Sequence, residues 1–297
     1  MIATSHPMDE LLRADRLPHI LCAGCGIGTV IHCYVQAMAE SGIDLRDHVC
    51  VSGIGCSGRA AGYVNVDSYH TTHGRALPFA LGIAVHKPEL TVTVISGDGD
   101  LAAIGGNHFI HAARRNIDLT VICINNFNYG MTGGQMGPTT PRGAITSTAP
   151  LGCRDRPFNM PHLAKAAGAS FVARWTVLHV RQLKETLLRA MHKKGFCFVE
   201  VISPCPTGFG RANDLSQGID ELELYRERCC IENDIQDLGA VDIDITDHDS
   251  PIVVGNFVDI ERSSFLPEPG EPVRRPRSSA HWAAVRKTQD VEEKNGQ

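Results

Sequence analysis

A regular alternation of strand-like and helix-like segments between residues 26 and 202 constrains the fold of this chain more than any other feature. The strand-like segments are short apolar runs rich in β-branched residues, at 49–52, 91–96, 119–124, 170–173 and 197–202. The segments between them carry apolar residues at helical spacing, at 27–40, 75–86, 104–115 and 177–193. This order predicts an α/β fold in which a parallel sheet has helices on both faces. Ligands of such sheets bind beyond the carboxyl ends of the strands.

The sequence divides into three parts around this alternating region. Residues 1–17 are expected to form an N-terminal arm, and residues 18–212 the α/β domain. The composition changes from residue 213, so 213–297 is expected to be a C-terminal extension with a charged, helical stretch at 219–237. About the last 30 residues are polar and rich in proline, which predicts a flexible tail.

Composition and charge argue against several classes of function. The formal net charge of −5 over 297 residues argues against nucleic acid as the main partner. No apolar run approaches the roughly 20 residues that a membrane-spanning helix needs. The N-terminus lacks the apolar core of a signal peptide. A cytoplasmic protein that does not enter the membrane is therefore expected.

Polar residues follow two of the predicted strands at the point where each strand ends. The strand at 91–96 runs into Gly97-Asp98-Gly99-Asp100, and the strand at 119–124 is followed by Asn125-Asn126. Glycines let a ligand approach the backbone, and the N-terminus of the following helix offers free N–H groups to phosphate. An aspartate beside phosphates requires a cation between them, and Mg²⁺ suits a site with few carboxylates. The two motifs together predict a diphosphate that is held through Mg²⁺.

Eleven cysteines are many for a chain of this size without a signal peptide. Those that lie in apolar segments or lack a partner at ligand spacing are interpreted as structural: Cys33, Cys50, Cys123, Cys153, Cys197, Cys229 and Cys230. The others lie after predicted strands or before a helix: Cys22, Cys25, Cys56 and Cys205. Four thiolates could hold a 4Fe–4S cluster or zinc, and Cys22-x-x-Cys25 could be a redox-active dithiol. One close pair with two distant cysteines favours the cluster modestly, because structural zinc sites usually use two close pairs.

The order of the motifs identifies a family. The GDG and Asn-Asn motifs resemble the diphosphate-binding module of thiamine-diphosphate enzymes. Residues 18–240 as a whole resemble the β subunit of 2-oxoacid:ferredoxin oxidoreductases, through motifs in this order: CAGC at 22–25, IGCS at 54–57, HTTHGRALP at 70–78, GDGD at 97–100, HFIHAARRN at 108–116, YGMTGGQ at 129–135 and CPT at 205–207. The resemblance implies an enzyme with thiamine diphosphate, Mg²⁺ and one 4Fe–4S cluster. Such an enzyme oxidatively decarboxylates a 2-oxoacid to an acyl-coenzyme A and reduces ferredoxin.

The resemblance also assigns residues to each group. The Mg²⁺ ligands would be Asp98, Asn126 and the carbonyl oxygen of Asn128, and the cluster ligands would be Cys22, Cys25, Cys56 and Cys205. Residues expected to contact thiamine diphosphate are Ile54, Gly55, Cys56, Ser57, His73, Gly99, Asp100, Gly130 and Met131. His73 and Arg75 are expected to act in catalysis, and Arg75, Arg142 or a residue of the α subunit could bind the distal carboxylate of a substrate.

An enzyme of this kind works with partners. By resemblance, the carboxylate that activates the aminopyrimidine ring of the cofactor and much of the coenzyme A site lie on a separate α subunit, so the chain alone is expected to be inert. Tyr129-Gly-Met-Thr and Pro138-Thr-Thr resemble the 2-oxoglutarate and branched-chain groups of the family more than the pyruvate group. Some 2-oxoglutarate members carry lysine where this chain has Gly134. The expected substrate is 2-oxoglutarate, with branched-chain 2-oxoacids or pyruvate as alternatives.

Two hypotheses outside this family stay open at this point. The chain could be a cluster-free thiamine-dependent decarboxylase or synthase, or a non-catalytic electron-relay module with the same fold. If ferredoxin is the partner, Arg211, Arg154 and Arg156 are candidates for a basic docking surface, because ferredoxins are generally acidic.

Overall fold

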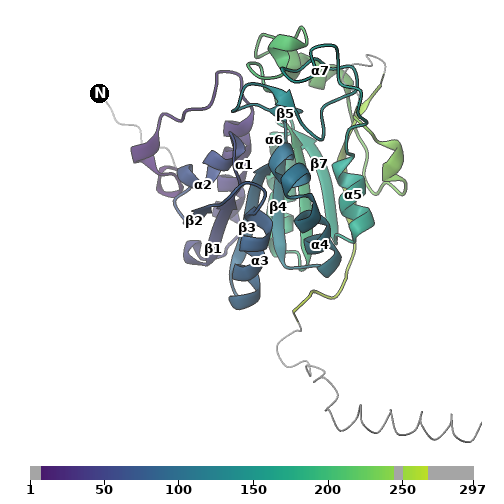
Figure 1. The fold of residues 1–297 in the computed structure, drawn as a ribbon. Helices are drawn as coiled ribbons and strands as arrows, with labels where there is room; N and C mark the ends of the chain where they lie inside the picture. The colour runs from purple at the N-terminus through teal and green to yellow at the C-terminus, as the bar shows by residue number, and fades with distance from the viewer. Residues whose placement is uncertain (1–7, 244–249, 267–297) are drawn as a thin grey trace, which may run out of the picture. The chain divides into compact units, whose positions relative to one another are not determined.

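The centre of the structure is a sheet built from buried runs rich in β-branched residues (Figure 1). The computed structural model describes residues 8–243 and 250–266. The strands predicted from the sequence are present as β1 (His48–Ser52), β3 (Thr91–Gly97), β4 (Leu119–Asn125), β7 (Phe171–Thr176) and β8 (Phe196–Ile202). Every residue of β4 and β8 is buried, as is expected for strands that are covered on both faces.

In the part of the chain that the structure describes, eight strands form this sheet in the order β2-β1-β3-β4-β8-β7-β10-β9. β2 (Asp67–His70) and the five strands above are mutually parallel. β10 (Ile252–Asp259) pairs antiparallel with β7, and β9 (Cys229–Ile231) pairs parallel with β10. A separate short pair consists of β5 (Asn128–Tyr129) and β6 (Gln135–Met136). The carboxyl ends of β2, β1, β3, β4 and β8 therefore share one edge of the sheet.

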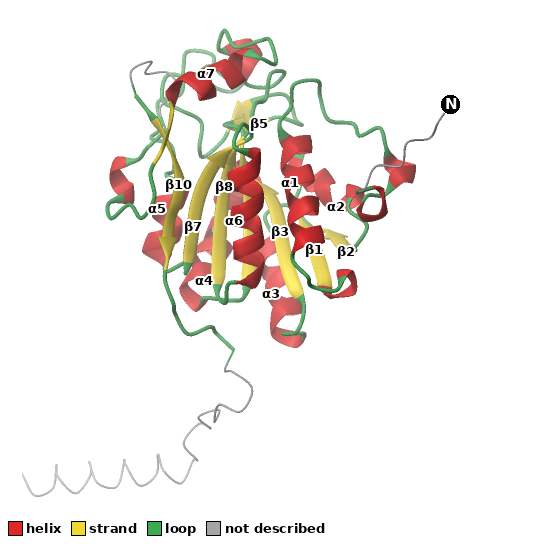
Figure 2. Ribbon diagram, turned by 180° about the vertical axis from the view of Figure 1, so that it is seen from behind, coloured by secondary structure: helices red, strands yellow, loops and turns green. Residues whose placement is uncertain are grey.

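Helices cover both faces of the sheet (Figures 1 and 2). One face carries α3 (Ala76–His86), α4 (Gly106–Arg115) and α5 (Met160–Ala167), and the other carries α1 (Ile27–Glu40) and α6 (Val180–His192). Each face has its own hydrophobic cluster, which contains Phe109 and Phe198 on the first face and Tyr34 and Leu187 on the second. The predicted α/β fold with helices on both faces is confirmed.

Short helices occupy several connections. They are α2 (Ala60–Tyr63), the π-helix Gly99–Ile104, and the 3₁₀-helices Asp9–Leu11, Ala14–Arg16, Leu45–Asp47, Ser57–Arg59, Gly210–Ala212 and Leu238–Ala240. None of the helices in residues 8–243 and 250–266 is long and apolar enough to cross a membrane.

The segment after residue 212 completes the sheet. The helix predicted at 219–237 is present as α7 (Asp220–Arg228), which ends where the chain turns into β9. β10 then adds to the edge of the sheet beside β7, and the described residues 8–243 and 250–266 belong to one compact unit. The predicted flexible tail lies outside the described residues.

Candidate active site

Loops that leave the carboxyl ends of four neighbouring strands meet in a cavity of about 100 Å³. We call it the diphosphate cavity. The loops follow β1, β2, β3 and β4. The lining residues are Ile54, Gly55, Cys56, Ser57, His73, Gly97, Asp98, Gly99, Asp100, Asn126, Asn128, Tyr129, Gly130, Met131 and Thr132. Every residue expected to contact thiamine diphosphate or Mg²⁺ lies in this lining.

The carboxyl group of Asp98 is buried in the diphosphate cavity, with 2% of the residue exposed. The hydroxyl of Thr139 donates to its Oδ2 atom and lowers the pKa of the carboxyl group, as do the backbone N–H groups of Gly99 and Asn126. Burial nevertheless raises the pKa of Asp98 to about 7, because removal from water disfavours the charged form. A bound cation would favour the carboxylate and offset this cost, so the residues present fit a Mg²⁺ site.

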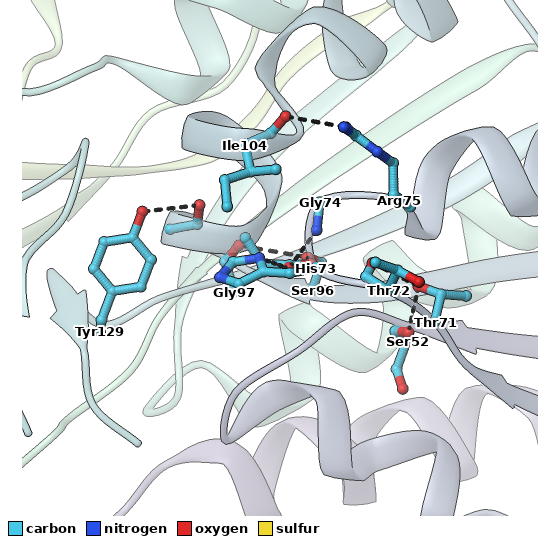
Figure 3. Close-up of polar contacts among 12 residues, drawn as sticks. Ser52, Thr71, Thr72, His73, Gly74, Arg75, Ser96, Gly97, Ile104 and Tyr129 are labelled. Atoms are coloured by element: carbon cyan, nitrogen blue, oxygen red, sulfur yellow. Dashed lines mark hydrogen bonds and ion pairs between the residues drawn. The ribbon is translucent and has the colours of Figure 1, made fainter. Parts of the chain in front are cut away.

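Asp100 makes its contacts with Gly74, Ser96 and His73, which Figure 3 labels. Its carboxylate accepts the backbone N–H of Gly74 at 2.8 Å and the hydroxyl of Ser96 at 2.7 Å, and it lies against Nδ1 of His73. Both carboxylate oxygens are therefore engaged. Asp100 lines the cavity, but its contacts fix the loop after β2 and orient His73.

The turn after β3 leaves no space for a side chain at Gly99. A Cβ atom on Gly99 would lie 2.4 Å from the ring of Tyr129, and the Tyr129 hydroxyl donates to the Gly99 carbonyl at 3.3 Å (Figure 3). The π-helix Gly99–Ile104 begins at this turn, and π-helical turns are frequent at functional sites. A helix that begins in the cavity lining provides backbone N–H groups of the kind that bind phosphate.

β4 ends in a strained turn that brings Asn126 and Asn128 into the cavity lining. Phe127 between them has φ = 64°, a conformation that is costly for a residue with a side chain. Two hydrogen bonds hold it. The Asn125 side-chain oxygen accepts the Phe127 N–H at 3.2 Å, and the Thr140 hydroxyl donates to the Phe127 carbonyl at 2.6 Å. Strain held by such bonds is typical of ligand-binding turns.

The four candidate cluster ligands line a second cavity of about 310 Å³, which we call the cysteine cavity. Cys22 and Cys25 precede α1, Cys56 follows β1, and Cys205 follows β8. The lining residues common to both cavities are Cys56, Asn126, Gly130 and Met131. The two cavities are therefore neighbours along one edge of the sheet.

Three thiols of the cysteine cavity, those of Cys25, Cys56 and Cys205, are poor acids without a bound cation. Burial raises the pKa of Cys25 to about 12, with further increases from the nearby Cys205, Cys56 and Cys22. Burial likewise raises the pKa of Cys56 and of Cys205. A metal or cluster would stabilise all four thiolates. No three His, Cys, Asp or Glu side chains in the described ranges converge closely enough to hold a single metal ion. The four cysteines instead surround a cavity, an arrangement that suits a cluster.

Known proteins resemble this chain in sequence and in fold. Residues 53–201 match the family model described as "Thiamine pyrophosphate enzyme, C-terminal TPP binding domain". The chain is 49% identical over 263 residues to the 2-oxoglutarate synthase subunit KorB of Methanocaldococcus jannaschii, covering 89% of this chain and 96% of that relative. The chain belongs to the KorB family.

Another relative and a solved structure support the assignment to the KorB family. The KorB subunit of Archaeoglobus fulgidus is 54% identical over 198 residues, which are 67% of this chain and 74% of that relative. A solved structure, "2-oxoglutarate:ferredoxin oxidoreductase from Magnetococcus marinus with 2-oxoglutarate, coenzyme A and succinyl-CoA bound", aligns with a TM-score of 0.76 at 31% identity and covers 88% of each chain. The family predicted from the order of the motifs is confirmed.

One predicted catalytic residue of this KorB chain lies outside both cavity linings. The side chain of Arg75 reaches the carbonyl of Ile104 at 3.4 Å (Figure 3). It also reaches Nε2 of His108 at 2.9 Å. Arg142, the other candidate for a distal carboxylate, is also absent from both linings. The structure thus brings His73, but neither arginine, to the diphosphate cavity.

Two residues near the cavities were not singled out from the sequence. Thr139 donates a hydrogen bond to Asp98. In the sequence, only its place in the Pro138-Thr-Thr motif could have indicated a role at the site. Arg59 lies in the lining of the cysteine cavity. Its position three residues after Cys56, on the loop that leaves β1, could have indicated it.

Proposed function

We propose that this chain is the β subunit of a 2-oxoglutarate:ferredoxin oxidoreductase. It would take part in converting 2-oxoglutarate, coenzyme A and oxidised ferredoxin to succinyl-CoA, CO₂ and reduced ferredoxin. The observation that carries the proposal is that the diphosphate cavity and the cysteine cavity share lining residues. Decarboxylation coupled to electron removal requires such neighbours, because electron transfer needs proximity.

Thiamine diphosphate would bind in the diphosphate cavity through Mg²⁺. Asp98 supplies the carboxylate, and Asn126 and the carbonyl of Asn128 supply neutral oxygens, with phosphate and water completing the set. The buried Asp98 carboxyl with its raised pKa supports this assignment, since a cation relieves the cost of its charge. Gly99 supports it as well, because any side chain there would collide with Tyr129.

A 4Fe–4S cluster would bind in the cysteine cavity through Cys22, Cys25, Cys56 and Cys205. Cys56 lines both cavities and therefore connects the cluster to the thiamine site. The remaining cysteines do not line either cavity, and Cys33, Cys50, Cys123 and Cys197 are fully buried in the core.

When bound, thiamine diphosphate supplies the nucleophilic carbon and the electron sink that decarboxylation requires. The residues of the chain hold and orient the reacting groups. Asp100 fixes His73, which can then donate or accept a hydrogen bond at a defined place in the cavity. The four cysteines would hold the cluster, which would supply a one-electron path from the thiamine site to ferredoxin.

The second part of the active site would come from an α subunit. Thiamine enzymes use a carboxylate against the aminopyrimidine ring, and this carboxylate lies on a second α/β module. The described part of this chain contains one α/β sheet and the diphosphate end of the site. The functional unit would therefore be a heterodimer or a dimer of heterodimers.

The test is anaerobic co-purification with the α subunit, followed by assay with three 2-oxoacids. Reduction of ferredoxin that depends on 2-oxoglutarate and coenzyme A, with the isolated chain inert, is the expected result. A higher kcat/KM with pyruvate or with a branched-chain 2-oxoacid would reassign the substrate. Thiamine diphosphate without iron in the purified complex would favour a cluster-free decarboxylase and contradict the proposal.

A further inference from the structure

A third cavity, of about 360 Å³, adjoins the cysteine cavity and is lined by basic side chains. We call it the arginine cavity. Its lining residues are Arg13, Arg16, Arg59, Ala61, Gly62, Ser68 and His70. Arg59 lines the arginine cavity and the cysteine cavity alike. A continuous path of lining side chains therefore leads from the cysteines to this basic surface.

The N-terminal segment brings two of the arginines to this place, and Figures 1 and 2 show it beside α2 and β2. The Arg13 N–H donates to the Tyr63 carbonyl at 2.8 Å, and the Asn65 N–H donates to the Leu11 carbonyl at 2.8 Å. These two bonds fix the segment against the loop between α2 and β2. The segment therefore presents the guanidinium groups at a defined position.

Neutral oxygens hold the guanidinium groups. Arg13 donates to the Val66 carbonyl at 3.2 Å and to the Ser68 hydroxyl at 2.9 Å. Arg16 donates to the Gly62 carbonyl at 3.1 Å. These contacts orient the side chains but leave their positive charge uncompensated.

None of the three arginines forms an ion pair within residues 8–243 and 250–266. Other arginines of the chain do, such as Arg189 with Asp259 at 2.5 Å. The chain carries a net charge of −5, so three uncompensated arginines in one cavity are a local exception. Such a concentration of one sign creates a positive field that attracts an acidic partner.

We propose that the arginine cavity is the docking site of an acidic, ferredoxin-type electron carrier. The inference rests on the proposed function, which requires electrons to leave from the cysteine cavity. Charge complementarity supports the choice of partner, and the shared Arg59 places the docking surface next to the electron donor. Carboxylates of the carrier would pair with the exposed Arg16 and Arg59.

The exposure of these side chains favours a protein over a small anion. Arg16, Arg59 and His70 are exposed, whereas sites for a single phosphate group are built largely from enclosed donors. The sequence suggested a different docking surface, formed by Arg154, Arg156 and Arg211. The positive charge of that surface is reduced at Arg156. Arg156 is already paired with Asp242 at 2.8 Å, so its charge is compensated within the chain.

The test uses the anaerobic α/β complex and a purified acidic ferredoxin. Arg16→Glu reverses one charge in the arginine cavity, and Arg114→Glu makes the same change on the exposed surface of α4. The dissociation constant for ferredoxin should rise about tenfold or more in Arg16→Glu at low salt, and the difference should shrink near about 1 M salt. Arg114→Glu should bind as the unmodified complex does. Arg16→Gln, which is a milder change, should give a smaller rise.

Two further readouts separate the possible outcomes. Turnover of Arg16→Glu with an uncharged dye should be unchanged, while the KM for ferredoxin rises. Binding that is unchanged in both Arg16 variants, or weakened only in Arg211→Glu, would overturn the proposal. A raised KM for coenzyme A or 2-oxoglutarate without weaker ferredoxin binding would show a small-anion site and overturn it too. Ferredoxin binding is measured without turnover. If the complex does not convert 2-oxoglutarate but Arg16→Glu still weakens ferredoxin binding, the proposed function alone is contradicted.

Discussion

Asp98 binds a cation only as a carboxylate, and burial raises its pKa to about 7. Retention of thiamine diphosphate with Mg²⁺ should therefore be constant above pH 7 and fall below it, by up to about tenfold per pH unit. Thr139→Val removes the hydroxyl that lowers this pKa, so the midpoint should move to higher pH. Cofactor titrations by fluorescence over this range of pH measure both midpoints.

Asp98→Ala is the companion variant. Removal of the carboxylate leaves the diphosphate charge uncompensated, so this protein should lose the cofactor at every pH while its circular dichroism stays native. Normal retention in Asp98→Ala, or an unmoved midpoint in Thr139→Val, would contradict the assigned Mg²⁺ site.

The cysteine assignments give a second prediction for single residues. Replacing any one of Cys22, Cys25, Cys56 or Cys205 with Ala should lower the iron content of the anaerobically purified protein. Cys33→Ala should keep full iron, because Cys33 is buried in the core under α6. Iron and sulfide analysis decides the question. Full iron in Cys205→Ala together with loss in Cys153→Ala would refute the ligand set.

His48 makes the stability of the chain depend on pH. It is buried at the start of β1, and burial lowers its pKa below the ordinary value of about 6.5. The folded state therefore binds this proton less well than the unfolded state. The stability contributed by neutral His48 is complete above about pH 6.5 and is lost as the pH falls below this value.

His48→Gln should accordingly show a weaker loss of stability between pH 7 and pH 5 than the unmodified chain, by up to about 1.4 kcal/mol per pH unit. The exposed His111→Gln serves as the control and should keep the slope of the unmodified chain. Urea unfolding at several pH values measures these slopes. Equal slopes in all three proteins would exclude His48 as the source.

At the scale of elements, a buried ion pair joins β7 and β8, and a hydrogen bond connects it to β4. Arg174 on β7 donates through Nε to Glu200 on β8 at 2.6 Å, and each is 1% exposed. Asn125 at the end of β4 donates to the other Glu200 oxygen at 2.9 Å, and Arg174 also donates to the Val241 carbonyl at 2.9 Å. The network thus connects the strained turn of the diphosphate cavity to the sheet and to the C-terminal extension.

Glu200→Ala should reduce the free energy of unfolding by about 3–5 kcal/mol, because it leaves a buried guanidinium without a partner. The double variant Arg174→Met with Glu200→Leu should recover most of that loss, since well-packed apolar residues often replace a buried pair at little cost. Urea unfolding of the single and double variants tests this. A loss below about 1 kcal/mol in Glu200→Ala would show that the pair is not stabilising.

Elements with strong periodicity were predictable, and short or irregular ones were not. The runs that form β3, β4 and β8 consist mostly of apolar residues and were found within a residue or two of their bounds. α5 was missed although Asn159 caps its N-terminus and Gly168 ends it, because the helix has eight residues and offers few apolar repeats. β2 was missed because three of its four residues are exposed, so it lacks the apolar signal.

At the scale of the whole molecule, the ligand-bearing loops were predictable from the parallel sheet. Residues at the ends of parallel strands must meet at one edge, which is why Asp98 and Asn126 could be paired without a structure. The place of the extension could not be predicted. Its strand β10 joins beside β7 after a long connection, and nothing in the local sequence specifies that partner. The arginine cavity could not be predicted either. Arg13 and Arg59 are far apart in the sequence, and the local sequence does not indicate that they come together.

The central claim is that electrons from a 2-oxoacid reach a cluster held next to the thiamine site of this chain. The most direct measurement is anaerobic addition of 2-oxoglutarate to the α/β complex without ferredoxin, followed by electron paramagnetic resonance. The account predicts the signal of a reduced 4Fe–4S cluster, which is absent from Asp98→Ala and from the complex depleted of thiamine diphosphate. If CO₂ is released while the cluster stays oxidised, or if no cluster is present to be reduced, the account is contradicted.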